Sequence, residues 1–252
     1  MDAIRIGMIL PSSNTVVEPV ASAMVADLCA ALPADVAPVS VHFSRFALTA
    51  VQVDNPAATY YDSGALLGAA KLLADARCHV ICWNGSAGGL VGFERDRQLC
   101  REITAATGSA ATTASLALLD SLKHAAVRQF ALITLNPPEM NETIKAHFAQ
   151  EGFACAASTH RTGITDNFAM AQVPPETIAA DATGAIGSCG NARPSAVVIY
   201  GTNTRGAPVA RMLEARLGMP VFDSVAWGVF GALLQAGVDI RSLTAWAPHA
   251  PI

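Results

Sequence analysis

The sequence predicts an α/β protein made of two pseudo-symmetric lobes, each built around a mainly parallel sheet. Short runs rich in β-branched residues alternate with longer stretches rich in Ala and Leu, the pattern typical of parallel sheets covered by helices. The chain also repeats itself. RIGMILPSSN and HVICWNGSAGG in the first half are matched at similar spacing by QFALITLNPP and AVVIYGTNTRG in the second. Of the 252 residues, 52% are hydrophobic, which is enough for a substantial core.

The individual elements follow from these runs in chain order. We expect strands at Ile4–Leu10, Ala37–Phe43, Val80–Trp83, Ala131–Thr134, Ala154–Ser158, Ala196–Tyr200 and Pro220–Phe222. We expect helices at Val17–Leu32, Ala65–Ala76, Phe93–Ala106, Thr113–His124, Pro138–Glu151, Pro174–Gly187, Ala207–Leu217 and Ala226–Ala236. Caps support two of them: Asn136 precedes a helix that Gly152 closes, and Pro208 lies in the first turn of a helix that ends before Gly218.

The repeat also predicts how the lobes are divided and where a ligand binds. We expect a first lobe over residues 1–125, a second over 126–237, and a terminal segment, 238–252, that returns to the first lobe. Ligands of open α/β sheets bind outside the carboxyl ends of the strands. With two such sheets facing each other, the predicted site is the cleft between the lobes.

Composition excludes several classes of function. The net charge of −4 gives no electrostatic indication of binding to nucleic acid or an anionic membrane, and no apolar run approaches the ~18–20 residues that span a bilayer. The opening MDAIRIGMIL does not resemble a signal peptide, so we expect a cytoplasmic protein. Six scattered cysteines without a CxxC motif indicate buried free thiols and no metal site. The sequence has no Walker lysine after the first loop and no GxGxxG motif, so nucleotide binding is not indicated.

Three loops carry candidate functional groups. In PSSNTVVEP, the residues Ser12, Ser13 and Asn14 offer short polar side chains and backbone N–H groups at a helix start, which suits a carboxylate or phosphate. The alternative is that Ser13 or Asn14 merely caps the helix. Gly85-Ser86 and Gly201-Thr202 end two strands and present paired N–H and O–H donors, as an oxyanion hole does. Each is alternatively an ordinary turn, but their matching positions in the repeat favour one shared site.

These segments resemble a known superfamily. RIGMILPSSNTVVEP and HFSRFAL are similar to the opening of maleate cis–trans isomerases, and ALITLNPPEMNE and GITDNFAMAQV to segments of maleate isomerases and arylmalonate decarboxylases. AVVIYGTNTRGAPVARMLEARLGMPVFDS resembles the last strand–helix–strand unit of the wider aspartate/glutamate racemase superfamily. The resemblance implies two flavodoxin-like lobes, a site between them, a small carboxylate-bearing substrate, no cofactor or metal, and frequent homo-oligomers.

The resemblance also assigns roles to residues. Asn14 and Asn167 would hold a substrate carboxylate from the two lobes. Ser86 and Ala87 would donate from the first lobe, and Thr202 and Asn203 from the second. Arg45 is a weaker candidate whose alternative role is a surface ion pair. The remaining substrate-binding candidates are Asn84, Gly85, Asn136 and Gly201.

The chain departs from the family pattern at the catalytic positions. Family racemases and isomerases use two cysteines, one after the second strand of each lobe, and the resemblance aligns these with Gly85 and Gly201. A one-residue slip puts Asn84 at the first position, which is still not a thiol. The family tyrosine corresponds to Asn136, and Tyr200 lies where it can partly refill the second position. Cys82 is predicted to be a core thiol, with a catalytic role as the alternative.

Without thiols, the sequence favours hydrolysis of a small amide, imide or lactam that bears a carboxylate. Water or the hydroxyl of Ser86 or Thr202 would attack, with Asp223 as the first candidate base and a helix cap as its alternative role. Tyr200 completes the catalytic candidates. A decarboxylase or isomerase acting through an enolate, and a non-catalytic carboxylate-binding protein, stay open as alternatives.

Overall fold

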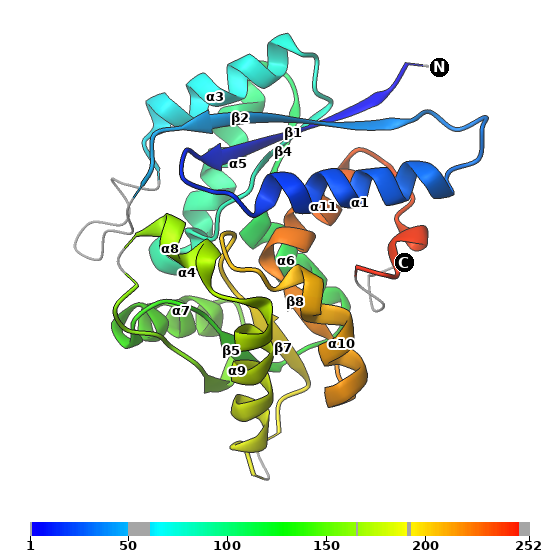
Figure 1. Ribbon diagram of the computed structural model, residues 1–252. Coiled ribbons are helices and arrows are strands. Elements are labelled where there is room, and N and C mark those ends of the chain that lie inside the picture. Colours follow the sequence, from blue (N-terminus) through cyan, green and yellow to red (C-terminus); the bar gives the residue numbers. More distant parts are fainter. Residues whose placement is uncertain (1, 50–60, 165, 191–192, 247–252) are drawn as a thin grey trace.

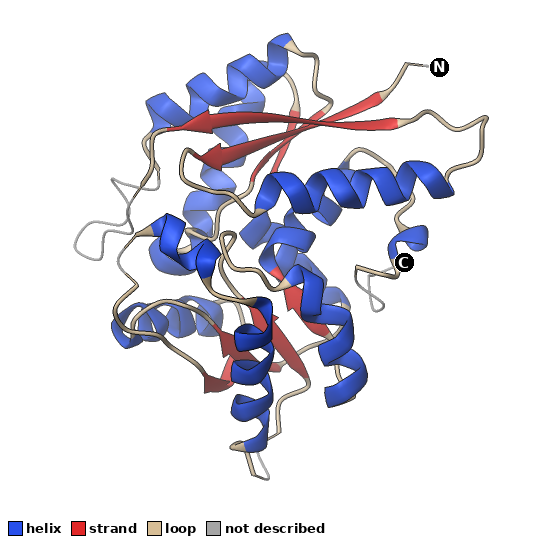
Figure 2. Ribbon diagram, viewed as in Figure 1, coloured by secondary structure: helices blue, strands red, loops and turns tan. Residues whose placement is uncertain are grey.

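The computed structural model describes residues 2–49, 61–164, 166–190 and 193–246, and these form two parallel four-stranded sheets covered by helices (Figures 1 and 2). The first sheet has the strand order β2-β1-β3-β4, with β1 at Ile4–Pro11, β2 at Val39–Phe46, β3 at Val80–Trp83 and β4 at Ala110–Thr113. The second has the order β6-β5-β7-β8, with β5 at Gln129–Ile133, β6 at Ala154–Ser158, β7 at Ala196–Ile199 and β8 at Val221–Asp223. Corresponding strands take the same place in each sheet, so the predicted two-lobed α/β fold is confirmed.

The helices separate these strands. Those of the first half are α1 (Val17–Ala31), α3 (Ser63–Asp75), α4 (Gly88–Val91), α5 (Phe93–Thr107) and α6 (Ala114–His124). Those of the second half are α7 (Pro138–Gln150), α8 (Asn167–Gln172), α9 (Pro175–Gly187), α10 (Ala207–Leu217) and α11 (Ser224–Gln235), followed by the short 3-10 helix η1 (Arg241–Leu243). All seven expected strands and all eight expected helices are present, each within three residues of the expected bounds. The sequence analysis missed β4 and the short helices α4, α8 and η1.

The central strands β1, β3 and β7 are buried on both faces, as parallel strands between two helical layers require. One apolar core runs through both lobes and joins residues of β1 and β3 to residues of β5 and β7. Each sheet also has one smaller apolar cluster on its other face. The lobes therefore share their largest core, and this fixes the position of one set of strand ends against the other.

The chain returns to the first lobe after β8. Helix α11 packs against α6, α1 and the strands β3 and β4, although it begins directly after β8 of the second sheet (Figure 1). The helix η1 then contacts α1, and the Trp246 indole Nε1 donates to Asp27 Oδ2 at 2.9 Å. Within the described residues, no helix is long and apolar enough to cross a membrane.

Candidate active site

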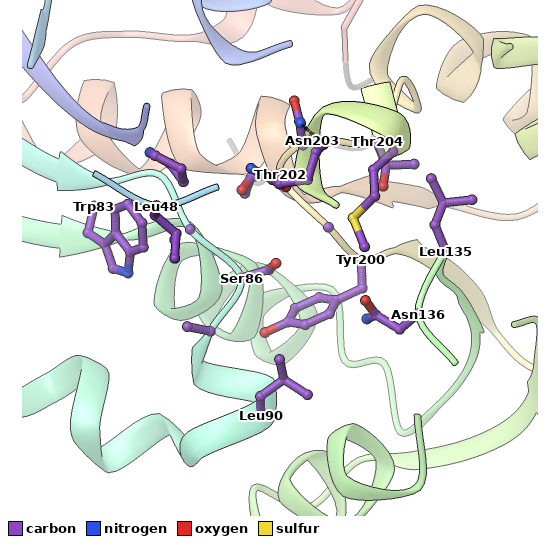
Figure 3. Close-up of a pocket in the computed structure, with 16 residues that line it drawn as sticks. Leu48, Trp83, Ser86, Leu90, Leu135, Asn136, Tyr200, Thr202, Asn203 and Thr204 are labelled. Atoms are coloured by element: carbon purple, nitrogen blue, oxygen red, sulfur yellow. Dashed lines mark hydrogen bonds between the residues drawn. The ribbon is translucent and has the colours of Figure 1, made fainter. Parts of the chain in front are cut away.

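A small pocket lies between the lobes, where β1, β3, β5 and β7 end (Figure 3). Its volume is ≈ 50 Å³. It is lined by Pro11, Leu48, Trp83, Gly85, Ser86, Ala87, Leu90, Leu135, Asn136, Asn167, Met170, Tyr200, Gly201, Thr202, Asn203 and Thr204. The carboxyl ends of parallel strands meet at one edge of a sheet, so both halves of the repeat contribute loops to this single site.

Backbone donors from both lobes are available at the pocket. The N–H groups of Ser86 and Ala87, after β3, donate to no other described residue, and the same holds for Thr202 and Asn203 after β7. The Ser86 hydroxyl likewise has no hydrogen-bond partner in the described part of the chain. Unpaired donors of this kind are well suited to stabilise negative charge that develops on a bound substrate.

Tyr200 joins the two lobes beneath these loops. Its hydroxyl accepts a hydrogen bond from the Gly89 backbone N–H at 2.8 Å and lies 3.0 Å from Ser115 Oγ. Both partners belong to the first lobe, whereas Tyr200 follows β7 of the second. Burial raises the pKa of the Tyr200 phenol well above its usual value, so this side chain is a neutral hydroxyl at any ordinary pH.

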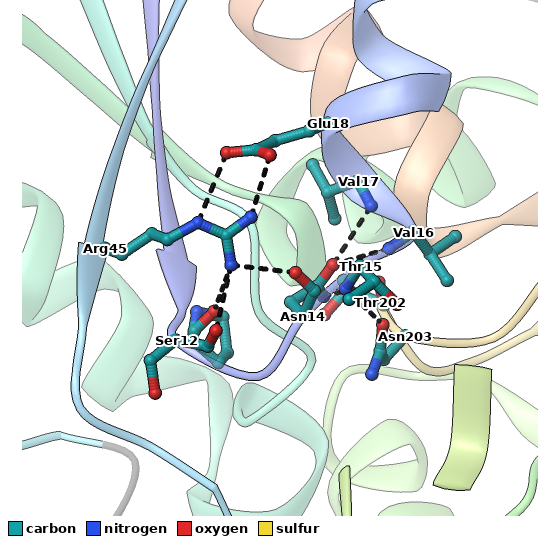
Figure 4. A network of polar contacts seen from close by, with 10 residues as sticks. Ser12, Asn14, Thr15, Val16, Val17, Glu18, Arg45, Thr202 and Asn203 are labelled. Atoms are coloured by element: carbon teal, nitrogen blue, oxygen red, sulfur yellow. Dashed lines mark hydrogen bonds and ion pairs between the residues drawn. The ribbon is translucent and has the colours of Figure 1, made fainter. Parts of the chain in front are cut away.

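Asn14 lies behind the pocket wall and is not among the residues that line it. Its Oδ1 accepts from the backbone N–H groups of Val16 and Val17, both at 3.0 Å, at the start of α1 (Figure 4). Its Nδ2 donates to the Thr202 carbonyl oxygen at 2.8 Å. The side chain therefore satisfies the helix start, which was the alternative in the sequence analysis, and also holds the pocket loop of the other lobe.

Polar side chains of both lobes form a network between the first loop and the loops that carry Asn167 and Asn203. Asn203 Oδ1 accepts from the Thr15 N–H at 3.1 Å, and its Nδ2 donates to the Asn167 carbonyl oxygen. Asn167 Nδ2 donates to Ser13 Oγ at 2.9 Å, and Ser13 Oγ donates to the Leu48 carbonyl oxygen at 2.6 Å. Asn167 and Asn203 line the pocket, whereas Ser12 and Ser13 do not. Ser12 Oγ accepts instead from the Leu48 N–H at 3.1 Å.

Arg45 supports the first loop from outside. It forms an ion pair with Glu18 at 2.8 Å and donates to the carbonyl oxygens of Pro11, Ser12 and Asn14 (Figure 4). The ion pair that the sequence analysis gave as the alternative is therefore present, and Arg45 is not among the residues that line the pocket.

Asp223, Asn84 and Cys82 also lie outside the pocket lining. Asp223 caps α11: its Oδ1 accepts from the N–H groups of Val225 and Ala226 at 3.0 Å, and burial raises the pKa of its carboxyl to about 7. Asn84 is fully buried, and its Nδ2 lies 3.8 Å from a methionine sulfur in β1. Cys82 is a core residue whose thiol pKa is raised well above its usual value by burial, which opposes a thiolate.

The structure thus brings together eight of the fourteen candidates at the pocket surface. These are Gly85, Ser86, Asn136, Asn167, Tyr200, Gly201, Thr202 and Asn203. The sequence analysis did not find the apolar lining, which consists of Pro11, Leu48, Trp83, Leu90, Leu135 and Met170, nor the hydroxyl residue Thr204. Apolar residues of a pocket look like core residues in a sequence. Thr204 had a usable signal, because it stands two positions after Thr202 in the same loop.

The two glycines at the aligned cysteine positions are closely packed. A Cβ atom at Gly85 would lie 2.2 Å from the Trp83 ring. Gly201 has a φ of +144°, and a Cβ atom there would lie 2.8 Å from Thr204 Oγ1. Trp83 and Thr204 therefore occupy space that a side chain at Gly85 or Gly201 would need. The backbone conformation of Gly201 is also one that other residues rarely adopt.

The pocket has hydrogen-bond donors and apolar walls but few groups that titrate. Among the described residues that line it, Tyr200 is the one ionisable side chain, and no Asp, Glu, His, Lys, Arg or Cys is present. Likewise, no three His, Cys, Asp or Glu side chains of the described chain are grouped as metal ligands. The lining can bind a carboxylate and stabilise an oxyanion, but it offers no base for activating water.

The fold and the pocket define a two-lobed α/β protein with a pocket between its lobes. The chain belongs to the arylmalonate decarboxylase family: the family model described as "Arylmalonate decarboxylase" matches residues 6–245. The expected membership of the maleate isomerase/arylmalonate decarboxylase branch is therefore confirmed.

Individual relatives agree with this assignment. Over 142 residues the chain is 33% identical to arylmalonate decarboxylase from Bordetella bronchiseptica, a match that covers 52% of this chain and 54% of the relative. The chain thus spans about half the length of the curated relative that it matches. A mutant of arylmalonate decarboxylase in a liganded form has 26% identity and a TM-score of 0.77, and 92% of each chain is covered.

Two maleate isomerases have the same fold. A variant of the enzyme Iso from Pseudomonas putida S16, crystallised with maleate, superposes with a TM-score of 0.83 and 22% identity over 94% of this chain and 93% of that chain. A mutant maleate cis-trans isomerase from Nocardia farcinica, with a covalently bound succinylcysteine intermediate, gives a TM-score of 0.80 and 22% identity over 98% and 96%.

Proposed function

We propose that this protein decarboxylates a small malonate-type dicarboxylate, one whose central carbon carries an aryl or alkyl group, without using a thiol. The observation that carries the proposal is the lining of the pocket: unpaired N–H donors from two loops, apolar walls, and no base among the described residues. Decarboxylation needs no base to start, because departure of CO2 itself generates the carbanion.

The N–H donors would bind the carboxylate that stays. When the bond to the other carboxyl breaks, its electron pair passes into the remaining carboxylate and gives an enediolate with charge on both oxygens. Donors from Ser86, Ala87, Thr202 and Asn203 would stabilise this charge more strongly than that of the ground state. A proton then adds to the central carbon and completes the monocarboxylate product.

The apolar lining would promote loss of the second carboxyl. Leu48, Leu135 and Met170 are at most 8% exposed and offer no donor to a carboxylate. A carboxylate held against such a surface loses hydration without gaining hydrogen bonds, whereas neutral CO2 does not. The same surface can accept the aryl or alkyl group of the substrate.

The other activities are less well supported. Hydrolysis, which the sequence analysis put first, needs a base next to water or a hydroxyl, and Asp223 caps α11 outside the pocket lining. The succinylcysteine of the Nocardia farcinica relative shows that an isomerase of this fold uses a thiol. No cysteine is among the described residues that line the pocket here.

The test is a panel of substrates followed by proton NMR and by measurement of released CO2. Phenylmalonate, an alkylmalonate, maleate, and a carboxylate-bearing amide and lactam would each be incubated with the purified protein. The expected result is CO2 and one equivalent of monocarboxylate from a malonate, with the other compounds unchanged. Conversion of maleate to fumarate, or amide cleavage without CO2, would overturn the proposal.

A further inference from the structure

A chain of hydrogen bonds begins and ends on the pocket loop that follows β3. The Gly89 N–H donates to the Tyr200 oxygen at 2.8 Å, and the Tyr200 and Ser115 hydroxyl oxygens lie 3.0 Å apart. Ser115 Oγ lies 3.3 Å from the carbonyl oxygen of Gly85. In Figure 3 the Tyr200 ring reaches from the second lobe towards the loop that carries Ser86. Ser115 itself, in α6, is 1% exposed and is not among the residues that line the pocket.

The direction of this chain follows from the number of protons. A hydroxyl group has one proton to donate. Among the described residues, the Ser115 oxygen is the one acceptor for the Tyr200 O–H, so Tyr200 donates to Ser115. The Ser115 proton is then left for the Gly85 carbonyl oxygen. The buried Asp96 carboxyl does not take it, because its Oδ1 accepts from Tyr61 at 2.6 Å and its Oδ2 has no hydrogen-bond partner in the described chain.

The bond to the Gly85 carbonyl also orients the N–H of the next residue. The described residues contain no cis peptide bond, and in a planar trans peptide the carbonyl oxygen and the following N–H point in opposite directions. The Gly85 carbonyl is directed at buried Ser115. The Ser86 N–H therefore points away from Ser115, on the side where Gly85 and Ser86 line the pocket, and it donates to no other described residue.

The second lobe holds a donor peptide in the same way. Asn14 Nδ2 donates to the Thr202 carbonyl oxygen at 2.8 Å, and the same peptide unit carries the unpaired N–H of Asn203. Asn14, like Ser115, is 1% exposed and lies outside the pocket lining. In each pocket loop, a buried polar side chain thus binds one carbonyl oxygen and leaves the N–H of that peptide on the opposite side.

We propose that Ser115 is a positioning residue of the site: it holds the Gly85–Ser86 peptide so that the Ser86 N–H binds the substrate carboxylate and then the enediolate. The role towards the enediolate rests on the proposed decarboxylation. Glycine has no Cβ atom, so little else restrains rotation of the peptide that follows Gly85. A rotated peptide would turn its carbonyl oxygen towards the pocket, where the partial negative charge would repel the enediolate. Ser115 acts through this peptide and not by touching the substrate.

Ser115→Ala removes the donor to the Gly85 carbonyl. Alanine is a good helix former, so α6 should persist. With phenylmalonate as substrate, we expect kcat and kcat/KM for CO2 release to fall together by about 10- to 100-fold, within the ~10²–10³-fold effect of losing an oxyanion donor outright. The matched control is Ser121→Ala, a buried serine of the same helix whose hydroxyl donates to the Ala117 carbonyl at 2.7 Å. It should keep the kcat of wild type.

The Ser86 amide gives a second measurement that does not depend on turnover. In ¹⁵N-labelled wild type and in Ser121→Ala, titration with phenylacetate should shift the Ser86 amide proton downfield as it donates to the carboxylate. This shift should be smaller or absent in Ser115→Ala. Ser115→Cys keeps the shape of the side chain with a weaker donor, so its kcat should lie between those of wild type and Ser115→Ala.

The outcomes separate the two proposals. An unchanged kcat in folded Ser115→Ala or Ser115→Cys overturns the positioning role, and so does a Ser86 shift that is absent in wild type or unchanged in Ser115→Ala. Absence of CO2 from wild type with every malonate overturns the proposed function, and the Ser86 shift then decides on the role of Ser115 by itself.

Discussion

The side-chain nitrogen of Asn14 donates to the carbonyl oxygen of Thr202 at 2.8 Å, across 188 residues of sequence. The Asn14 oxygen accepts from the N–H groups of Val16 and Val17 where α1 begins, so one buried side chain fixes a helix of the first lobe and a pocket loop of the second. The N–H donors of Thr202 and Asn203 depend on this loop for their position. The geometry of this loop is therefore set by the contact between the lobes.

Asn14→Asp separates these two roles. The carboxylate still caps α1 but has no proton for the Thr202 carbonyl, which it then repels. We expect the free energy of unfolding to fall by about 1–3 kcal/mol and kcat for CO2 release to fall more than KM changes. Urea unfolding and steady-state kinetics measure both.

The matched control is Asn141→Asp. Asn141 is an equally buried amide whose Nδ2 donates to the Thr159 carbonyl at 2.6 Å, within the second lobe. It should lose stability without losing the same share of activity. Equal losses of kcat in the two variants would show that the link between the lobes has no special role.

Ala87→Pro removes one backbone donor from the pocket. Ala87 has a φ of −69°, which proline can adopt, and its N–H makes no hydrogen bond with another described residue. We expect kcat to fall by about 10²–10³-fold, the usual effect of losing one oxyanion donor, with little change in thermal stability. Ala87→Ser, which keeps the N–H, should retain most of the activity. If both variants are equally active, Ala87 does not bind the enediolate.

Gly85→Ala should destabilise the protein, because the new methyl group would lie 2.2 Å from the Trp83 ring. Relief requires movement of a fully buried indole, so we expect a loss of about 1–3 kcal/mol in the free energy of unfolding. Gly68→Ala, in α3, is the control: it has open space around its Cβ position and should gain about 0.5–1 kcal/mol. A neutral Gly85→Ala would mean that the indole has room to move.

Asp223→Asn should change how stability depends on pH. Burial raises the folded-state pKa of Asp223 from 3.8 to about 7, so between these values the folded state binds more protons than the unfolded state. Below about pH 4 the carboxyl is protonated in both states and does not reduce the free energy of unfolding. As pH rises from 4 towards 7, the unfolded state ionises first and the free energy of unfolding falls. Asparagine keeps the helix cap and removes this cost. The stability of the variant relative to wild type should rise between pH 4 and 8, by at most about 4 kcal/mol.

Denaturant unfolding at pH 4, 6 and 8 measures the difference. Asp96 has a raised pKa of the same origin, so the Asp223→Asn variant should itself still lose some stability with rising pH. A constant difference between Asp223→Asn and wild type over this range would contradict the assignment of a raised pKa to Asp223.

The sequence predicted the lobes because their signal is local and repeated. Apolar runs define buried strands, and the same succession of loops and helices recurs in both halves. It missed β4, since Ala110–Thr113 consists of small residues that look like the start of the following helix. It missed α4, because two of its four residues are glycines with no helical preference.

The candidate site was less accessible to sequence reasoning for a physical reason. The sequence left two possible roles open for each of Asn14 and Asp223: a functional group of the site or a helix cap. Which role applies depends on contacts with residues far along the chain. Trp83 was assigned to a strand, correctly, but a strand assignment does not show that its ring also borders the pocket. Asp96 is one of two acids in the first turn of α5, and only its burial distinguishes it.

The most direct test of the central claim is decarboxylation in D2O by wild type and by Cys82→Ala, with CO2 and deuterium followed together. Cys82 is the cysteine nearest to Gly85 in the sequence, and it is fully buried. The account predicts equal rates of CO2 release per folded molecule, with one deuterium at the central carbon for each CO2. Loss of CO2 release in a Cys82→Ala protein that remains folded would contradict it and would make the reaction dependent on a thiol.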